Sequence, residues 1–284
     1  MLAPYVKAPE RIHSTFSDDY RRESVLALAK TEVSVFGLGL AYYTDLTNHC
    51  IETVRISERV LILASDTGTV DFIKSINPNV ENIYRFYRED VPRNKIYDEI
   101  CEHIIGVIDE SISVSILIYG HPTIYVNPIV QFLERCPRDK ATVSVYPGCS
   151  AEDWLFAALE IDPSFHGWIS YEATNFVLFD RLADSSTYLV LWQIGALGIL
   201  TYKYKDIDIQ ENLRTLRECL EKTYSPTAQC VAFEASPYVA IDHRKDFFNL
   251  KDLEQQTFTK RSTLLIMPEK KPPKRSDVNQ LMIQ

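Results

Sequence analysis

Short apolar, β-branched runs alternate along the first half of the chain with longer segments in which apolar residues recur at helical spacing. The expected strands are residues 32–40 (EVSVFGLGL), 59–65 (RVLILAS), 82–87 (NIYRFY), 113–119 (SVSILIY) and 141–148 (ATVSVYPG). The expected helices lie near residues 44–57, 68–76, 93–110 and 126–135. Strands that alternate with helices predict a largely parallel sheet with helices on both of its faces.

The helix expected at residues 93–110 (RNKIYDEICEHIIGVIDE) has the clearest amphipathic pattern. Isoleucines recur on it at four-residue spacing and so share one face: Ile96, Ile100, Ile104 and Ile108. We expect this face to pack against the sheet.

Beyond residue 148 the pattern becomes richer in strands. Strands are expected at residues 168–180, 188–194, 229–236 and 261–267, with one clear helix at 209–224. The predicted fold class is therefore α/β, with a parallel-sheet N-terminal half at residues 32–147 and a strand-rich C-terminal half at 148–268. Residues 1–31 are expected to form an N-terminal extension with a helix at 17–30, and residues 269–284 a flexible Pro/Lys tail.

The composition limits the classes of protein. Hydrophobic residues make up 46% and charged residues 24% of the 284 residues, which is ordinary for a globular protein. The formal net charge of −9 argues against a large nucleic-acid interface. No segment has the ~18 apolar residues of a membrane helix, and no secretory signal is present, so we expect a cytoplasmic protein. The scattered cysteines and histidines favour neither disulfides nor a metal site.

The strand expected at residues 113–119 ends abruptly in Tyr-Gly-His-Pro, residues 119–122. Ligands of parallel α/β sheets bind beyond the carboxyl ends of the strands, so this segment is a candidate binding site. A histidine such as His121 is nevertheless more often a satisfied turn residue than a base. The Gly-x-Gly of FGLGL (36–40) lacks the third glycine of a dinucleotide fingerprint, and it allows close approach either to a ligand or to a neighbouring strand.

A second candidate cluster, YRFYREDVPRNKIY (84–97), leads into the long helix. Arg93 and Tyr97 are four residues apart and share a helix face. A guanidinium beside a tyrosine favours the phenolate, so the pair could serve as a general base with an oxyanion stabiliser. Stacking of tyrosine on arginine at a protein surface is the alternative that the pattern leaves open.

Together these segments resemble a known family. The motifs that carry the resemblance are VFGLGLAYYTDLT (35–47), INPNV (76–80), the strand that ends in Tyr-Gly-His-Pro, PGCSAED (147–153), IDPS (161–164), SYEATNFVLF (170–179), LVLWQI (189–194), FEAS (233–236) and STLLIMP (262–268). Their order is similar to that of the tetrapyrrole methylases, S-adenosylmethionine-dependent enzymes whose two α/β domains hold the cofactor in the cleft between them. Porphyrin-pathway members carry Gly-Asp-Pro where this chain has Gly-His-Pro. With its tyrosines, the chain instead resembles the borosin α-N-methyltransferases, which methylate backbone amides of a ribosomal peptide.

The resemblance implies a set of site residues and a cofactor. The catalytic residues would be Tyr87, Arg93, Tyr97 and Tyr119. The contacts to S-adenosyl-L-methionine would be Tyr119, His121, Ile124, Tyr125, Ala151, Gln193, Ala235, Ser262 and Thr263. No metal is implied. A peptide N–H is a very weak acid, because the nitrogen lone pair is delocalised into the carbonyl. We therefore expect Tyr97 with Tyr87 to loosen the amide proton, Arg93 to hold the imidate oxygen, and Tyr119 to lie near the sulfonium.

The resemblance also bears on partners. In fused members the peptide follows the catalytic domain, whereas here only the Pro/Lys tail ending in DVNQLMIQ (277–284) follows the last expected strand. We therefore expect a split enzyme that acts on a separate precursor peptide with a leader domain. The family's intertwined homodimer implies a heterotetramer with two precursors. A small-molecule methylase of the tetrapyrrole type and a catalytically silent peptide-binding homologue remain the alternatives. A ribosomal-RNA methylase is disfavoured by the net charge.

Overall fold

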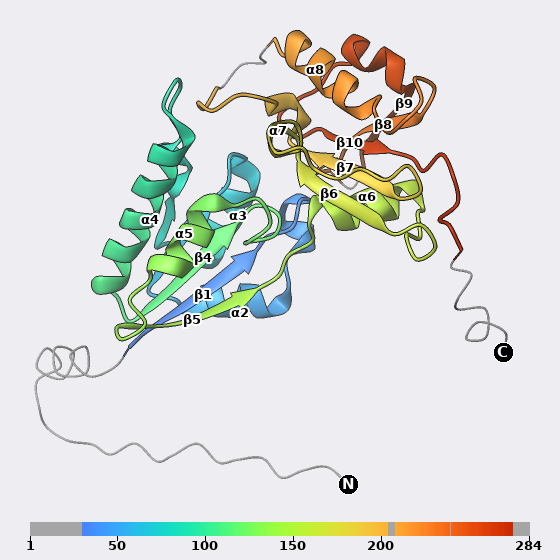
Figure 1. Ribbon diagram of the computed structural model, residues 1–284. Coiled ribbons are helices and arrows are strands. Elements are labelled where there is room, and N and C mark those ends of the chain that lie inside the picture. The colour runs from blue at the N-terminus through green and yellow to red at the C-terminus, as the bar shows by residue number, and fades with distance from the viewer. Residues whose placement is uncertain (1–29, 204–207, 239, 275–284) are drawn as a thin grey trace, which may run out of the picture.

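The first sheet is parallel throughout and occupies the N-terminal half of the chain (Figure 1). The computed structural model describes residues 30–203, 208–238 and 240–274. In order across the sheet, the strands are β3 (Val80–Asn82), β2 (Arg59–Leu63), β4 (Ser113–Ile118), β1 (Thr31–Gly37) and β5 (Ala141–Tyr146). β4 and β1 are central, and Val35 of β1 pairs with Ile116 of β4 and with Val145 of β5. Their near-continuous apolar runs are what a strand covered on both faces requires.

Helices cover both faces of this sheet, as the alternating pattern predicted. α4 (Arg93–Asp109) and α5 (Asn127–Arg135) bury their apolar sides against one face, where Val33 and Val35 lie in the same core cluster. α2 (Asn48–Ile56) and α3 (Thr67–Ile76) cover the other face, with Phe36 and Ile62. The isoleucine face expected on α4 is confirmed, because Ile96, Ile100, Ile104 and Ile108 are all buried in the sheet–helix core.

The second sheet is mixed. Its strands in order are β6 (Trp168–Glu172), β7 (Tyr188–Trp192), β10 (Thr263–Ile266), β8 (Gln229–Glu234) and β9 (Arg244–Asn249). β6 and β7 are parallel, whereas the other neighbouring pairs are antiparallel. α7 (Ala173–Leu178) and α8 (Gln210–Leu220) pack on one face, and α6 (Ala151–Leu159) packs on the other. The predicted fold class, a parallel-sheet half followed by a strand-rich half, is therefore confirmed.

Two expected strands are shorter than predicted, and in both cases a polar side chain turns the backbone. The strand expected at residues 82–87 ends at Asn82, whose side-chain oxygen accepts the N–H of Tyr84 at 2.9 Å and starts the 3₁₀ helix η2 (Ile83–Phe86). The strand expected at 168–180 ends at Glu172, whose carboxylate accepts the N–H of Asn175 at 2.8 Å and caps α7. Such side-chain caps compete locally with strand pairing.

Other elements were not predicted. α6 begins with a capping box in which Ser150 and Asp153 bond to each other's backbone N–H groups. β9 is an edge strand with charged, exposed positions, so it lacks an apolar pattern. Short 3₁₀ helices also form: η1 (Tyr42–Asp45), η3 (Ile194–Ala196) and η4 (Leu250–Gln255). The helix expected at residues 17–30 lies almost entirely outside the described residues.

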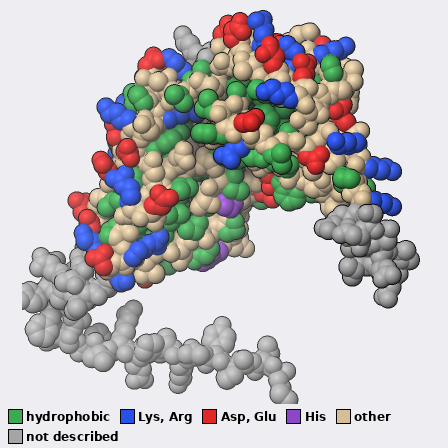
Figure 2. Space-filling model, in the orientation of Figure 1, with side chains coloured by type: hydrophobic (Ala, Val, Ile, Leu, Met, Phe, Trp, Pro, Cys, Tyr) green, Lys and Arg blue, Asp and Glu red, His purple; other side chains and the backbone are tan. Residues whose placement is uncertain are grey.

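Exposed apolar side chains gather around β6 and α7. Those of highest exposure, between 46% and 74%, are Phe165, Trp168, Leu178, Phe179 and Leu182. Figure 2 shows hydrophobic side chains on the visible surface of the second half. They do not all share one face, because the ring of Trp168 lies 5.5 Å from that of Phe156 in α6, which covers the face of the sheet opposite α7. Large exposed apolar side chains are common at contact surfaces.

The cysteines are free thiols, and all but Cys149 and Cys219 are buried. Within the described ranges, no group of three or more His, Cys, Asp and Glu side chains is placed to hold a metal ion. No helix among the described residues is long and apolar enough to cross a membrane.

Candidate active site

The carboxyl ends of β1 and β4 meet through bare backbone. Gly39 and Gly120 exchange hydrogen bonds: the Gly120 N–H donates to the Gly39 carbonyl at 2.8 Å, and the Gly39 N–H donates to the Gly120 carbonyl at 3.2 Å. Gly120 has a φ of +75°, and a Cβ on Gly37 would lie 2.5 Å from the Gly120 carbonyl oxygen and from the Gly148 nitrogen. The Gly-x-Gly motif therefore provides the close approach to a neighbouring strand that the sequence allowed.

A cavity of about 670 Å³ opens beside this junction, between the two sheets. Both halves line it, and its volume is in the usual range for a small-molecule site. The predicted cofactor contacts that line it are Tyr119, His121, Ile124, Tyr125, Ala151, Gln193, Ala235 and Thr263. Segments that are more than 100 residues apart in the chain thus converge on one cavity.

Ser262 is the predicted cofactor contact that does not line the cavity. Its side chain is fully buried, donates to the Glu234 carboxylate and accepts the N–H of Thr259 at 2.7 Å. Glu234 also accepts from the Thr259 hydroxyl and from Arg244, both at 2.9 Å. In the structure, Ser262 therefore holds the turn of residues 259–262 behind the cavity wall.

Two lining residues have left-handed backbone conformations. The φ angles are +55° at Tyr125 and +58° at Gln193, where side chains other than glycine are disfavoured. The ring of Tyr125 lies 6.1 Å from that of Trp192, which is also part of the lining. Such conformations persist when the surrounding structure holds them, and they concentrate at binding sites.

His121 is both a turn residue and part of the cavity wall. Its Nδ1 accepts the backbone N–H of Thr123 at 3.2 Å, which closes the turn after β4. Burial lowers the pKa of His121, and the opposing charge of Asp153 does not reverse this. The imidazole is therefore mostly neutral near pH 7.

Tyr119 lies beside a cation that sequence reasoning missed. Burial raises the pKa of Tyr119, and the adjacent Arg261 guanidinium, which bonds to it, opposes this effect. Lys260 and Arg261 both line the cavity from the turn before β10. Lys260 precedes the strand expected at 261–267 and Arg261 begins it, but neither residue belongs to a motif that carries the resemblance.

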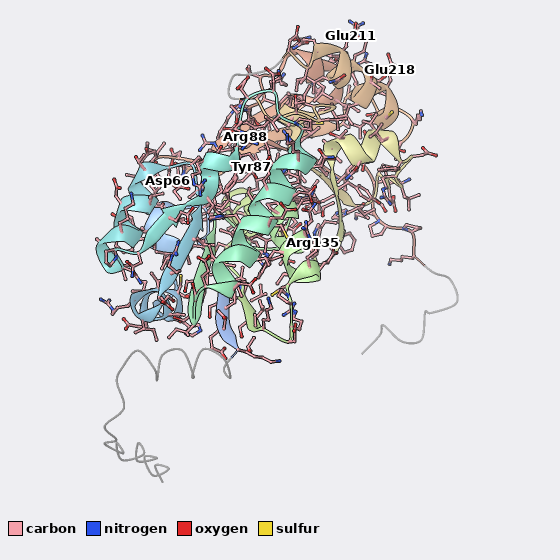
Figure 3. All side chains as sticks on the ribbon, turned by 90° about the vertical axis from the view of Figure 1, so that its left-hand side faces the viewer. Asp66, Tyr87, Arg88, Arg135, Glu211 and Glu218 are labelled. Carbon is pink, nitrogen blue, oxygen red and sulfur yellow. The ribbon has the colours of Figure 1, made fainter. Side chains whose placement is uncertain are left out.

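Tyr87, Arg93 and Tyr97 come together at the start of α4 but do not line the cavity itself. Tyr87 ends η2, and Figure 3 shows it at the end of α4 that faces the second half. Arg93 is the first residue of α4, and its charge acts on both tyrosines. Nearby cations are paired, Arg88 with Glu99 and Lys203 with Asp90. No carboxylate within the described part of the chain forms an ion pair with Arg93, so its guanidinium is available to an anionic group.

Arg93 lowers the pKa of Tyr97, as expected, but burial sets the direction of the net shift. Burial raises the pKa of Tyr97 by more than Arg93 lowers it, and the charge of Glu172 raises it further. Burial also raises the pKa of Tyr87, with smaller contributions from Tyr97 and Tyr84. At both tyrosines, the loss of hydration destabilises the phenolate by more than the Arg93 guanidinium stabilises it. Both tyrosines are therefore neutral phenols near pH 7.

Glu172 connects the tyrosines of α4 to the cavity. Burial is the main cause of the raised pKa of Tyr97 and of Tyr125, and the charge of Glu172 adds to both. Tyr125 belongs to the cavity lining, whereas Tyr97 belongs to α4. The contacts that join this cluster to the cavity run through Tyr202, whose ring lies 4.9 Å from that of Tyr87 and 4.9 Å from the ammonium of Lys260 in the cavity lining.

The fold is that of the tetrapyrrole methylases. A uroporphyrin-III-C-methyltransferase from Thermus thermophilus matches with a TM-score of 0.59 at 15% identity, over 84% of this chain and 92% of that one. A cobalt precorrin-4 methyltransferase matches with a TM-score of 0.56 at 13% identity, over 83% and 94% of the two chains. A second crystal structure of the Thermus thermophilus enzyme, complexed with S-adenyl homocysteine, has a TM-score of 0.53 at 14% identity and covers 83% of this chain and 92% of that one.

Sequence relatives give a narrower assignment. A methyltransferase/ribosomally synthesized type III borosin cyclic peptide precursor of Anomoporia bombycina is 30% identical over 265 residues, 93% of this chain and 30% of that protein. The methyltransferase/omphalotin A precursor of Omphalotus olearius is 28% identical over 250 residues, 87% of this chain and 60% of that protein. The chain thus spans between about a third and three fifths of these curated relatives. No protein-family model matches the chain. In sequence the chain is similar to borosin methyltransferase/precursor proteins, as the resemblance predicted.

Proposed function

We propose that this protein is an S-adenosylmethionine-dependent methyltransferase that methylates backbone amide nitrogens of a ribosomal peptide. The observation that carries the proposal is the adjacency of the interdomain cavity to the Tyr87–Arg93–Tyr97 cluster through Tyr202 and Lys260, in a chain similar to borosin methyltransferases. The cavity supplies a cofactor site at the strand ends, and the cluster supplies groups that can act on an amide.

The cavity lining fits S-adenosylmethionine. The N-terminus of α6, at Ser150 and Ala151, lines one wall and favours an anionic group such as a carboxylate. Aromatic faces of Tyr119 and Tyr125 and the carboxylate of Glu152 favour a sulfonium cation. When bound, the cofactor supplies an electrophilic methyl group.

The tyrosine–arginine cluster supplies the remaining chemistry. Methylation of an amide requires that its proton leave while negative charge collects on the carbonyl oxygen. The free guanidinium of Arg93 would hold that oxygen, and the oxygen of Tyr97 would take the proton, with Tyr87 beside it. A buried phenolate with a raised pKa is a strong base, which suits so weak an acid. Tyr119 would complete the set at the cavity mouth.

The substrate is proposed to be a separate precursor peptide with a leader domain. The exposed apolar side chains around β6 and α7 support a contact with another chain. We propose that two copies of this protein form a homodimer, and that two precursors complete a heterotetramer. Light scattering of the purified protein, alone and with the precursor, measures both steps. A monomer under both conditions contradicts this assembly.

We propose that the protein is cytoplasmic, and its free thiols, which suit a reducing compartment, support this.

Tandem mass spectrometry of a candidate precursor co-expressed with the protein tests the function. Backbone-localised additions of methyl groups are expected, and they should disappear with the Arg93→Ala variant. A peptide that binds tightly without modification would favour a silent peptide-binding protein. Methylation of a tetrapyrrole in place of the peptide would favour the small-molecule alternative.

A further inference from the structure

The loop after η3 crosses from the second half and pairs with the segment that leads into α4. The Tyr202 N–H donates to the Val91 carbonyl at 2.9 Å, and the Asp90 N–H donates to the Tyr202 carbonyl at 2.9 Å. The Arg93 N–H donates to the carbonyl of Leu200 at 3.1 Å. The first N–H groups of a helix have no partner within the helix, so the second half supplies one to α4 at Arg93.

The side chain of Tyr202 continues this contact into the tyrosine cluster. Its hydroxyl lies 2.6 Å from the Tyr84 hydroxyl, and its ring centroid lies 4.9 Å from that of Tyr87. The rings of Tyr84 and Tyr87 are also 4.9 Å apart, so Tyr87 is packed between two tyrosines that bond to each other. This arrangement restricts the Tyr87 ring from two sides.

Tyr202 also connects the cluster to the cavity. The Lys260 ammonium lies 4.9 Å from the centroid of the Tyr202 ring, a cation–π distance, and Lys260 is part of the cavity lining. Contacts therefore run without interruption from the cavity wall through Lys260 and Tyr202 to Tyr87. Each half of the molecule contributes to this chain of contacts.

We propose that Tyr202 is a positioning residue for methyl transfer, which orients Tyr87 and the start of α4 toward the cavity; this rests on the proposed function. The backbone of Tyr202 is hydrogen-bonded to Asp90 and Val91, just before Arg93. Its side chain is hydrogen-bonded to Tyr84 and packs against the ring of Tyr87. The tyrosine–arginine cluster thus has its full set of contacts only when the loop of residues 198–203 is hydrogen-bonded to residues 90–93 of the N-terminal half. A small displacement of reacting groups lowers rates steeply, so this seating affects turnover more than binding.

The first test compares Tyr202→Phe, which removes the hydroxyl, with Tyr202→Ala, which also removes the ring. We expect kcat for peptide methylation to fall about tenfold in the first variant and about a hundredfold in the second. The KM for the peptide and the Kd for S-adenosylhomocysteine should stay within about threefold of wild type. Tyr224→Phe is the matched control, because Tyr224 is a buried tyrosine whose hydroxyl donates to the Asp184 carbonyl away from the cavity.

A double-mutant cycle isolates the hydroxyl pair. If the two hydroxyls affect kcat only through the hydrogen bond between them, losing either one removes the whole effect. Tyr84→Phe, Tyr202→Phe and the double variant should then have similar kcat values. Wild-type kcat in Tyr202→Phe overturns the proposal. Equal losses of kcat and of cofactor affinity, with a lowered melting temperature, would show a merely structural role and overturn it as well.

A spectroscopic measurement separates this proposal from the proposed function. The ring of Tyr202 lies 4.9 Å from that of Tyr87, so removing it changes the magnetic surroundings of the Tyr87 ring. The aromatic NMR signals of Tyr87, assigned by their loss in Tyr87→Phe, should therefore shift in Tyr202→Ala. If wild type methylates no peptide but this shift occurs, the proposed function fails while the contact of Tyr202 with Tyr87 stands. Absence of the shift counts against Tyr202 whether or not the enzyme is active.

Discussion

The α-carbon of Gly37 lies so close to Gly120 that a Cβ there would be 2.5 Å from the Gly120 carbonyl oxygen. Gly37 is the last residue of β1, and Gly120, which follows the end of β4, lines the candidate cavity. The atoms that such a Cβ would meet belong to the backbone, which cannot move aside as the end of a flexible side chain can. The junction therefore requires glycine at position 37.

Gly37→Ala should therefore destabilise the protein by about 2 kcal/mol or more, because the strand ends must separate. Gly106→Ala is the matched control: a Cβ there meets nothing within 4 Å, in the last turn of α4. That substitution should stabilise by about 0.5–1 kcal/mol, since alanine favours helix more than glycine. Urea unfolding of the three proteins measures both changes. Equal midpoints for Gly37→Ala and wild type would contradict the close packing.

Arg93→Ala and Tyr97→Phe should each lower the methylation rate about a hundredfold or more while cofactor binding stays nearly intact. In the proposed mechanism both groups act on the peptide amide, and neither lines the cavity. Single-turnover rates and calorimetric titration with S-adenosylhomocysteine give the two quantities. Arg88→Ala serves as the control, because Arg88 is an exposed arginine paired with Glu99. Loss of cofactor affinity in the Arg93 or Tyr97 variant would reassign these residues to structure.

The pH dependence of the rate tests the identity of the base. The pKa of Tyr97 is raised from 10.0, so its phenolate is scarce at neutral pH and becomes tenfold more abundant with each pH unit. The single-turnover rate should therefore rise with a slope near 1 from about pH 7 to about pH 9.5, without a plateau. In Tyr97→Phe this slope should be lost. A plateau already below pH 7 would point to His121, whose pKa lies below its ordinary 6.5.

Ala151→Leu should raise the Kd for S-adenosylhomocysteine at least about tenfold, because a larger side chain fills part of the cavity at the start of α6. Ala157→Leu makes the same change at an exposed position of the same helix and should leave the Kd unchanged. Calorimetry measures the affinities, and circular dichroism confirms that both variants fold. Equal affinities for the two variants would place the cofactor elsewhere.

Alkaline stability provides an independent check on the buried phenols. Tyr87 has a folded-state pKa raised above its ordinary 10.0, chiefly by burial. Its contribution to stability is fully present below about pH 10 and is lost as the pH rises toward the folded-state value. The protein should therefore lose stability above about pH 10, and Tyr87→Phe should lose less. Parallel pH profiles for the two proteins would contradict the burial of this hydroxyl.

The sequence by itself determined the parts of the structure that depend on local patterns. Buried strands need continuous apolar runs, and the amphipathic face of α4 needs isoleucines at helical spacing, so both could be predicted. The placement of Tyr119 and His121 at the end of a central strand followed from the same patterns, because strand ends gather at one edge of a parallel sheet. The family resemblance then pointed to eight of the residues that line the cavity.

The tertiary structure alone decided features that depend on contacts between distant segments. Asn82 and Glu172 turned expected strands into helices through single side-chain bonds, which apolar patterns do not reveal. Tyr202, Lys260 and Arg261 reach the site from loops, where no periodicity marks a residue as near another. The pKa of Tyr97 also depends on how deeply its side chain is buried, and the spacing between Arg93 and Tyr97 in the sequence does not predict this burial. Spacing along the chain determines which neighbours share a face, whereas burial and long-range contact arise only once the two halves have packed together.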